Sequence, residues 1–376
     1  MDLGERNKLM KRAAKLRKAA QRTGKGRSRR PRGSWAEDEE GGRLKGPPAR
    51  SLNEFALDLL QAEEPPPAGV PDAGGGGERG TVVALLPGRC RLRGADRREW
   101  DCVLPRELAA TQRTSLAVGD QVELAPSDNG AAELLRVLPR RTHLSRPDPQ
   151  DPRLERVLAA NVDVVVIVAS VKRPALRPGL IDRAWIAVDR GGAETLLCVN
   201  KVDLLSAPGE RGRVLSQLAP YAELGLAVVP TSAETGEGLA RLREALAGRT
   251  AAFVGHSGVG KSSLLNALAP ELDLRARSGR EHDGKGRHTT TGSTLYELGA
   301  GLRVIDTPGV RTFGLWAIDG RSLADWFPDF GPFTGACRYG DCSHVHEPDC
   351  SVRAALERGE LSRVRYAAYL RLREDL

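Results

Sequence analysis

Residues 251–268 read "AAFVGHSGVGKSSLLNAL". The stretch predicts a buried strand that ends before Gly255 and a helix that begins near Lys261. Glycines in the segment between them would let the backbone turn tightly, so that successive N–H groups and the helix N-terminus face an anion. Lys261 would neutralise the β- and γ-phosphates of a nucleotide, and the Ser262 hydroxyl would bind Mg²⁺. The expected nucleotide contacts are Gly255, Ser257, Gly258, Val259, Gly260, Lys261, Ser262 and Ser263, and this set alone does not separate GTP from ATP.

A second stretch, "LRVIDTPGV" at residues 302–310, places an acidic residue at the end of an apolar strand. Asp306 can hold Mg²⁺, usually through water, and the backbone N–H of Gly309 can reach a γ-phosphate. By itself Asp-Thr-Pro-Gly could be an ordinary turn. Together with the phosphate loop it predicts the second half of a nucleoside triphosphate site.

A third motif, Asn200-Lys201-Val202-Asp203, predicts which base is bound. The Asp203 carboxylate can accept two hydrogen bonds, from N1–H and the exocyclic amine of guanine, whereas adenine offers no such pair of donors. Lys201 would lie along the base, and Asn200 would brace the neighbouring loops. Further along, "PTSAETGEGL" at residues 230–239 would present the backbone N–H groups of Ser232 and Ala233 to guanine O6.

The motifs occur in a rotated order, because the base-reading motif precedes the phosphate loop. In an open α/β sheet the ligand site depends on which loops meet at the strand ends, so a circular permutation preserves it. We therefore predict a circularly permuted P-loop GTPase domain over residues 150–315, with a doubly wound, mostly parallel sheet and helices between several strands. Its expected strands are residues 162–170, 194–200, 226–232, 250–255, 293–298 and 302–307.

The N-terminal part predicts a different organisation. Residues 80–145 alternate short apolar strands with Gly, Pro and Asp-Asn-Gly turns, which indicates a small β-barrel of the OB type. Residues 1–79 read as a disordered basic arm followed by a Pro, Gly and acidic linker. Residues 1–33 carry a net charge of +11, so the rest of the chain is at −3 of the total +8. The arm is either a binding segment for RNA or a solvated tail. We also expect phosphate contacts from Arg89, Arg91, Arg93, Arg97 and Arg98 in the first barrel hairpin.

The stretch "CRYGDCSHVHEPDC" at residues 337–350 gathers three of the six cysteines. The longest apolar run is too short to span a bilayer, and no apolar stretch follows the basic N-terminus as it would in a secretory signal, so we expect a cytoplasmic protein. In that compartment the cluster indicates a metal rather than disulfides. Residues 316–376 are therefore expected to form a zinc-binding module with helices. Its ligands to one structural Zn²⁺ would be Cys337, Cys342, His344 and Cys350, with His346 as a nearby alternative.

The rotated motif order, the upstream barrel and the downstream Cys/His cluster together resemble the RsgA (YjeQ) family of circularly permuted GTPases, from about Gly80 to the C-terminus. The resemblance implies a GTPase that binds the small ribosomal subunit and its rRNA late in assembly and is activated by it. It also marks "GRHTTTG" at residues 286–292 as the first switch, in which Thr290, rather than Thr289, would reach Mg²⁺. Catalytic roles are then expected for Lys261, Thr290 and His288. His288 would position water, with His256 as a weaker rival, unless it only contacts RNA or solvent.

Val310 stands where many GTPases carry a glutamine that orients the attacking water, so we expect slow intrinsic turnover. The leading hypothesis is an enzyme that uses GTP, Mg²⁺ and one Zn²⁺. A non-catalytic, GTP-bound rRNA-binding assembly factor is the alternative. A GTPase acting on mature ribosomes is disfavoured by the permuted order. We expect a monomer, other assembly factors as further partners, and no membrane association.

Overall fold

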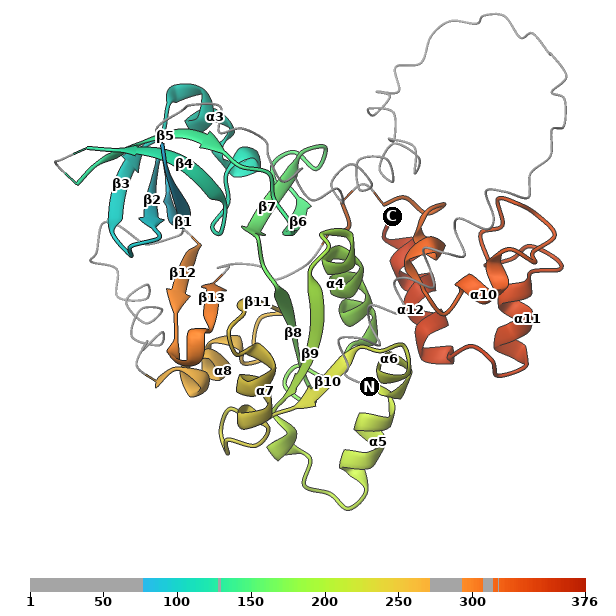
Figure 1. Ribbon diagram of the computed structural model, residues 1–376. Coiled ribbons are helices and arrows are strands. Elements are labelled where there is room, and N and C mark those ends of the chain that lie inside the picture. Colours follow the sequence, from blue (N-terminus) through green and yellow to red (C-terminus); the bar gives the residue numbers. More distant parts are fainter. Residues whose placement is uncertain (1–76, 128–129, 271–292, 307–313, 317) are drawn as a thin grey trace, which may run out of the picture. The chain divides into compact units, whose positions relative to one another are not determined.

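The computed structural model describes residues 77–127, 130–270, 293–306, 314–316 and 318–376 (Figure 1). These residues all belong to one unit, Gly74–Leu376. The basic arm, and most of the linker that follows it, lie outside the described residues. None of the described helices is long and apolar enough to cross a membrane.

The first described module is a small antiparallel barrel. Strand β1 (Glu78–Leu86) pairs with β2 (Arg89–Gly94) and β4 (Gln121–Pro126), β2 pairs with β3 (Glu99–Val103), and β4 pairs with β5 (Ala132–Val137). An isolated bridge between Asp101 and Ala131 brings β3 to β5 and closes the ring. Alternate residues of β2 and β3 enter the barrel core, among them Leu92 and Trp100. The barrel is thus described, and its assignment to the OB type stays a prediction.

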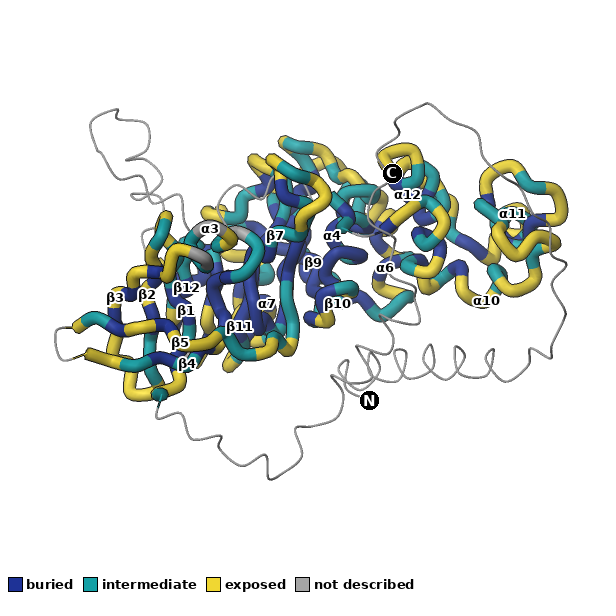
Figure 2. The backbone as a smooth tube through the Cα atoms, turned by 90° about the horizontal axis from the view of Figure 1, so that it is seen from above, coloured by how far each residue is buried: buried dark blue, intermediate teal, exposed yellow. Residues whose placement is uncertain are grey.

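The second module contains all six strands expected from the apolar runs. They are β8 (Val164–Ser170), β9 (Glu194–Asn200), β10 (Ala227–Pro230), β11 (Thr250–Val254), β12 (Thr294–Glu297) and β13 (Arg303–Asp306). Their order is β10-β9-β8-β11-β13-β12, with every neighbouring pair parallel except β13–β12. Figure 2 shows β9 and β11 as buried backbone. The mostly parallel sheet is therefore confirmed.

Helices cover both faces of this sheet because successive residues of β8 point to opposite sides. Val165 and Ile167 share a core with α4 (Pro178–Arg190) and with residues around α6 (Ala219–Glu223). Val164 and Val166 share a second core with α7 (Leu239–Leu246) and α8 (Lys261–Leu268). The sheet is thus doubly wound, as predicted. Helix α5 (Glu210–Ser216) precedes α6, and short 3₁₀ turns occupy η1 (Val202–Leu204) and η3 (Gly299–Gly301).

Three features were not anticipated. Helix α3 (Arg106–Ser115) lies between β3 and β4. The hairpin β6 (His143–Pro147) and β7 (Glu155–Ala160) spans the expected boundary between barrel and GTPase domain. Finally, β1 also pairs with β12 through Ala84 and Thr294, so the barrel and the central sheet are hydrogen-bonded to each other.

The C-terminal module holds η4 (Leu323–Trp326), α10 (Gly331–Thr334), α11 (Ser351–Glu357) and α12 (Arg363–Glu374). Helix α12 packs against α4 of the second module. Leu372 and Tyr369 of α12 are buried in the same core as α4. The expected helical C-terminal module is therefore present, and it is attached to the outer helix of one sheet face.

Candidate nucleotide-binding site and metal centre

The phosphate loop connects β11 to α8, as the sequence predicts. Gly255, Gly258 and Gly260 have φ angles of 150°, 82° and 97°, which disfavour any residue with a side chain. A Cβ atom on Gly255 would lie 2.3 Å from the Val168 carbonyl oxygen, and one on Gly260 would lie 2.4 Å from Asn200 Nδ2. Glycine is therefore required at both positions, by conformation and by space.

Lys261 and Asp306 meet at this loop. The Lys261 ammonium donates to the carbonyl oxygens of Gly255, at 2.5 Å, and His256, at 3.2 Å. Asp306 ends β13, where burial raises the pKa of its carboxyl while the positive charge of Lys261 acts in the opposite direction. Ser262 lies in the first turn of α8 and is exposed. The structure thus brings together the expected phosphate-binding cation and the expected Mg²⁺-binding carboxylate.

The turn predicted to read the base, residues 200–204 and called the base-reading turn below, is bonded directly to the phosphate loop. Asn200 Nδ2 donates to the Val259 carbonyl oxygen at 2.9 Å, and Asn200 Oδ1 accepts the N–H of Ala233 at 3.2 Å. Lys201 has a left-handed φ of 67°, and its ammonium donates to the Gly258 carbonyl oxygen at 2.5 Å. Motifs far apart in the chain therefore converge at one edge of the sheet, where the strands β9 and β11 end.

Asp203 is oriented by Ser232, whose hydroxyl donates to Asp203 Oδ1 at 2.5 Å. The same hydroxyl oxygen accepts the backbone N–H groups of Glu234 and Thr235, at 3.2 and 3.1 Å. The N–H groups expected to meet guanine O6 are engaged within the protein: that of Ser232 donates to the Glu237 carbonyl oxygen at 2.9 Å, and that of Ala233 donates to Asn200. Guanine O6 would therefore have to replace one of these acceptors.

Three site positions from the sequence lie outside the described residues. They are His288 and Thr290 of the expected first switch and Gly309 after Asp306. Their roles stay predictions. His256, the alternative to His288, is described, and its Nδ1 lies 2.8 Å from the Ser257 carbonyl oxygen.

The segment that follows β8 also contacts the base-reading turn, and no sequence motif predicted it. The Lys201 ammonium also donates to the carbonyl oxygen of Arg173 at 2.5 Å. The Ser170 hydroxyl donates to the Pro174 carbonyl oxygen at 2.7 Å, which closes the segment on itself. Its signal in the sequence is weak: a Lys-Arg-Pro turn at the end of a buried strand, with no motif to mark it.

The Cys/His cluster forms a compact set of ligand atoms. Those of Cys337, Cys342, His344 and Cys350 all lie within 4.8 Å of one another. His344 Nδ1 is 3.6 Å from Cys337 Sγ and 3.5 Å from Cys350 Sγ, and these two sulfurs are 4.0 Å apart. A tetrahedral zinc site has S···N edges of about 3.5 Å and S···S edges of about 3.8 Å, from Zn–S and Zn–N bonds of about 2.3 and 2.05 Å. The four residues fit zinc, and His346 is not part of the set.

Helix α12 holds the loop that carries these ligands. The Tyr366 hydroxyl donates to the His344 carbonyl oxygen at 2.7 Å, and the Tyr369 hydroxyl donates to the Ser343 carbonyl oxygen at 2.8 Å. Glu347 accepts the N–H groups of Ser343, Val345 and His346. Burial raises the pKa of the Glu347 carboxyl, but the hydrogen bonds outweigh burial and hold this pKa well below its usual range. The loop is thus braced as a structural metal site requires.

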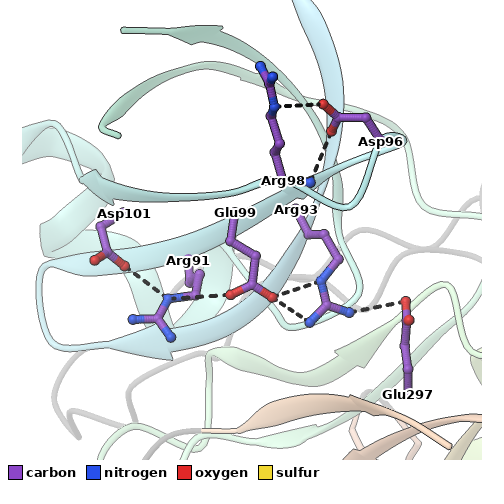
Figure 3. A network of polar contacts seen from close by, with 7 residues as sticks. All are labelled: Arg91, Arg93, Asp96, Arg98, Glu99, Asp101 and Glu297. Carbon is purple, nitrogen blue, oxygen red and sulfur yellow. Dashed lines mark hydrogen bonds and ion pairs between the residues drawn. The ribbon is translucent and has the colours of Figure 1, made fainter. Parts of the chain in front are cut away.

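Three of the five arginines expected to contact phosphate from the first barrel hairpin already have acidic partners (Figure 3). Arg91 pairs with Asp101 at 3.0 Å, and Arg98 pairs with Asp96 at 3.3 Å. Arg93 bridges Glu99 of β3, at 2.5 Å, and Glu297 of β12, at 3.1 Å. Phosphate contacts from these side chains would have to compete with carboxylates, since all three already have acidic partners.

Comparison with known proteins identifies the family to which this architecture is similar. The sequence model of the RsgA GTPase family matches residues 137–316. The small ribosomal subunit biogenesis GTPase RsgA of Gemmatimonas aurantiaca is 41% identical over 263 residues, which are 69% of this chain and 84% of the relative. The protein of the same name from Haemophilus influenzae is 37% identical over 308 residues, or 80% and 86% of the two chains.

Two solved structures share the fold. YjeQ from Thermotoga maritima superposes with a TM-score of 0.63 at 32% identity, over 80% of this chain and 98% of its own. YloQ, described as a circularly permuted GTPase, superposes with a TM-score of 0.61 at 25% identity, over 82% and 97%. The rotated order of strands and motifs is therefore shared with a circularly permuted GTPase of known structure, and the chain belongs to the RsgA GTPase family.

Proposed function

We propose that this chain is a GTP hydrolase that binds the small ribosomal subunit late in its assembly and converts GTP to GDP and phosphate. The observation that carries the nucleotide part is the pair of bonds from Asn200 and Lys201 to the carbonyl oxygens of Val259 and Gly258. They fix the guanine-reading turn against the phosphate loop. The ribosomal part rests on the names of the relatives.

Within this proposal each described group has a role. Lys261 would exchange its two carbonyl partners for β- and γ-phosphate oxygens. Ser262 and Asp306 would hold Mg²⁺ together with Thr290, and Gly309 would donate its N–H to the γ-phosphate. The zinc cluster would be structural, because its four protein ligands leave no open coordination position.

We infer the partners with the relatives' names as support. We assign the chain to the cytoplasm as a monomer that contacts rRNA of the small subunit and works beside other assembly factors. The basic arm would add phosphate contacts to those of the folded modules. The small subunit as partner is supported by the relatives' names, and the RNA contacts of the arm are supported by the charge of residues 1–33.

The alternative, a GTP-bound assembly factor without catalysis, is favoured by one observation. Val310 follows Gly309 where a water-orienting glutamine is common, and a valine side chain cannot hydrogen-bond to water. Hydrolysis would then depend on His288 or on a group that the subunit supplies.

The deciding experiment is GTP turnover by the full chain with and without purified small subunits. We expect the chain alone to hydrolyse GTP slowly and purified subunits to stimulate it. His288 should account for about 10²–10⁴-fold of the stimulated rate, the usual effect of one positioned side chain. His288→Ala should lose that part while still binding GTP and subunits. His346→Ala is the matched control, because His346 is exposed and outside the zinc ligand set. Binding of GTP and subunits without any stimulated turnover would establish the non-catalytic alternative.

A further inference from the structure

The base-reading turn is held from outside by two residues that no motif includes. Lys172 and Arg173 follow β8, the strand next to β9. The Lys172 ammonium donates to the Leu204 carbonyl oxygen at 2.8 Å. In return, the Lys201 ammonium donates to the Arg173 carbonyl oxygen at 2.5 Å. The two segments thus exchange lysine-to-carbonyl hydrogen bonds across the ends of the turn.

Lys172 is itself fixed in place by an ion pair. Its ammonium lies 2.7 Å from Glu210 Oε1, at the start of α5. Glu210 Oε2 also accepts the N–H of Ala207 at 3.3 Å, so the carboxylate is bonded to the loop between the turn and α5. Lys172 therefore connects three segments: the end of β8, the exit of the base-reading turn and the beginning of α5.

The bond to Leu204 acts one residue away from the group that reads guanine. The turn is closed by backbone bonds from the Leu204 N–H to the Lys201 oxygen, at 3.0 Å, and from the Leu205 N–H to the Val202 oxygen, at 3.1 Å. Asp203 lies inside this 3₁₀ segment. Its carboxylate is restrained from one side by Ser232. Lys172 restrains the backbone that carries the carboxylate from the other side.

We propose that Lys172 is a positioning residue for guanine recognition, because its bond to the Leu204 carbonyl oxygen fixes the turn from which Asp203 reaches the base. The inference rests on the proposed guanine-nucleotide site and deepens it. Lys172 needs no contact with the nucleotide. It keeps the turn in the conformation that binds, and affinity falls in proportion to the fraction of molecules in that conformation.

The test compares GDP with IDP, whose base lacks the exocyclic amine and so makes one of the two expected bonds to Asp203. Binding of each to the full chain is measured by calorimetry for the wild type and for Lys172→Met. If the turn is correctly placed in about one molecule in ten without Lys172, the Kd for GDP rises about tenfold. Molecules with a displaced turn still bind nucleotide through the phosphate loop, without the bonds to Asp203, and this residual binding limits the loss. The limit is reached sooner for IDP, which gains less from Asp203, so IDP should lose less and the preference for GDP over IDP shrinks. A role in overall stability alone would weaken both nucleotides equally.

Three further variants separate the parts of the argument. Lys172→Arg keeps a donor and should restore most of the preference. Glu210→Gln removes the charge that fixes Lys172 but keeps an amide oxygen as acceptor and leaves the bond to Leu204, so its loss should be smaller than that of Lys172→Met. Arg358→Met removes an exposed cation that pairs with exposed Glu360, and it should change nothing. In a double-mutant cycle, Lys172→Met should weaken GDP binding little once Asp203→Asn is present, because both act through one carboxylate.

The outcomes are distinct. A wild-type chain that shows no preference for GDP over ADP refutes the proposed function itself. A selective wild type with an unchanged Kd and an unchanged GDP/IDP ratio in Lys172→Met overturns only the role of Lys172. Equal losses for both nucleotides in Lys172→Met, unrestored by Lys172→Arg, overturn it as well.

Discussion

Replacing Arg365 with methionine should lower the free energy of unfolding by about 3–5 kcal/mol, the usual cost of leaving a buried charge without its partner. Arg365 in α12 is 1% exposed. Its guanidinium bonds to Asp182 of α4, and its Nη2 lies 2.8 Å from Asp329 Oδ1. Asp182 is fully buried, and its only other bond in the described residues comes from the Tyr221 hydroxyl at 2.8 Å. Methionine fills similar space but leaves this carboxylate uncompensated.

Aromatic rings add to the loss. The guanidinium carbon lies 4.5 Å from the ring centroid of Phe327 and 5.3 Å from that of Trp185. Such contacts contribute about 0.5–1 kcal/mol each at exposed sites and about 2 kcal/mol when desolvated. Part of this is regained by methionine, which also packs favourably on rings. The expected loss of unfolding free energy therefore stays within the range of about 3–5 kcal/mol given above for leaving the buried carboxylates without their partner.

Urea unfolding of the zinc-loaded chain, followed by fluorescence and circular dichroism, measures the effect, and coincident curves justify a single free energy. Arg358→Met, an exposed arginine paired with exposed Glu360, is the control and should change stability by no more than about 0.5 kcal/mol. Adding Asp182→Asn to Arg365→Met should recover part of the loss, because the unpaired charge disappears. A loss below about 1 kcal/mol for Arg365→Met, or a double variant no more stable than the single one, would refute the reasoning.

The remaining predictions concern the base, the metal and pH. Asp203→Asn should weaken GTP binding and admit xanthine nucleotide, whose O2 accepts where guanine donates; equal competition by ATP in the wild type would contradict the base assignment. The purified chain should carry about one zinc by elemental analysis, and Cys342→Ser should lose it while GTP binding stays measurable. Burial alone would raise the pKa of Glu155, but hydrogen bonds from His143 and Ser145 and the charge of Arg190 lower it to about 2 from its ordinary 4.5. Its ionised form therefore stabilises the fold above pH 4.5, and this contribution is lost as the pH falls through about 2. Glu155→Gln should cost about 1–2 kcal/mol at pH 7, after discounting for partial exposure, and progressively less in urea titrations below pH 4.5.

The central sheet could be predicted because its strands are buried on both faces. Such strands read as continuous runs of Val, Ile and Leu, as in "VVVIVAS" of β8, and need no partner to be recognised. The β6–β7 hairpin has no such run: β6 reads "HLSRP", with Leu144 and Ser145 buried. Its pairing depends on neighbours distant in the chain, and α3, "RELAATQRTS", has few apolar residues to mark it. Tertiary context decides both elements.

In the nucleotide site, too, some features could be predicted from local sequence and others depend on tertiary context. Side chains that must meet a fixed ligand occur in recognisable spacings, so Asn200, Lys201 and the glycine loop could be placed together before any coordinates. Bonds to backbone carbonyls carry no such signature, because every residue has a carbonyl. The bond from Lys172 to Leu204 therefore required the structure. The acidic partners of Arg91 and Arg93 also lie on other strands, and the sequence could not assign them.

The rotated chain order changes what the nucleotide site is attached to. Thr294, at the start of β12, pairs with Ala84 of the barrel, and Arg93 reaches Glu297 of the same strand. Thr294 also pairs with Asp306 on β13, the carboxylate expected at Mg²⁺. On the other side of the domain, α4 carries Asp182, and Arg365 bonds it to the zinc-binding module. Any shift of β12 and β13 on nucleotide exchange therefore reaches the barrel through the β1–β12 strand pair and the ion pair between Arg93 and Glu297. A permutation that keeps the site unchanged thus gives each flanking module its own bonded connection to the GTPase domain.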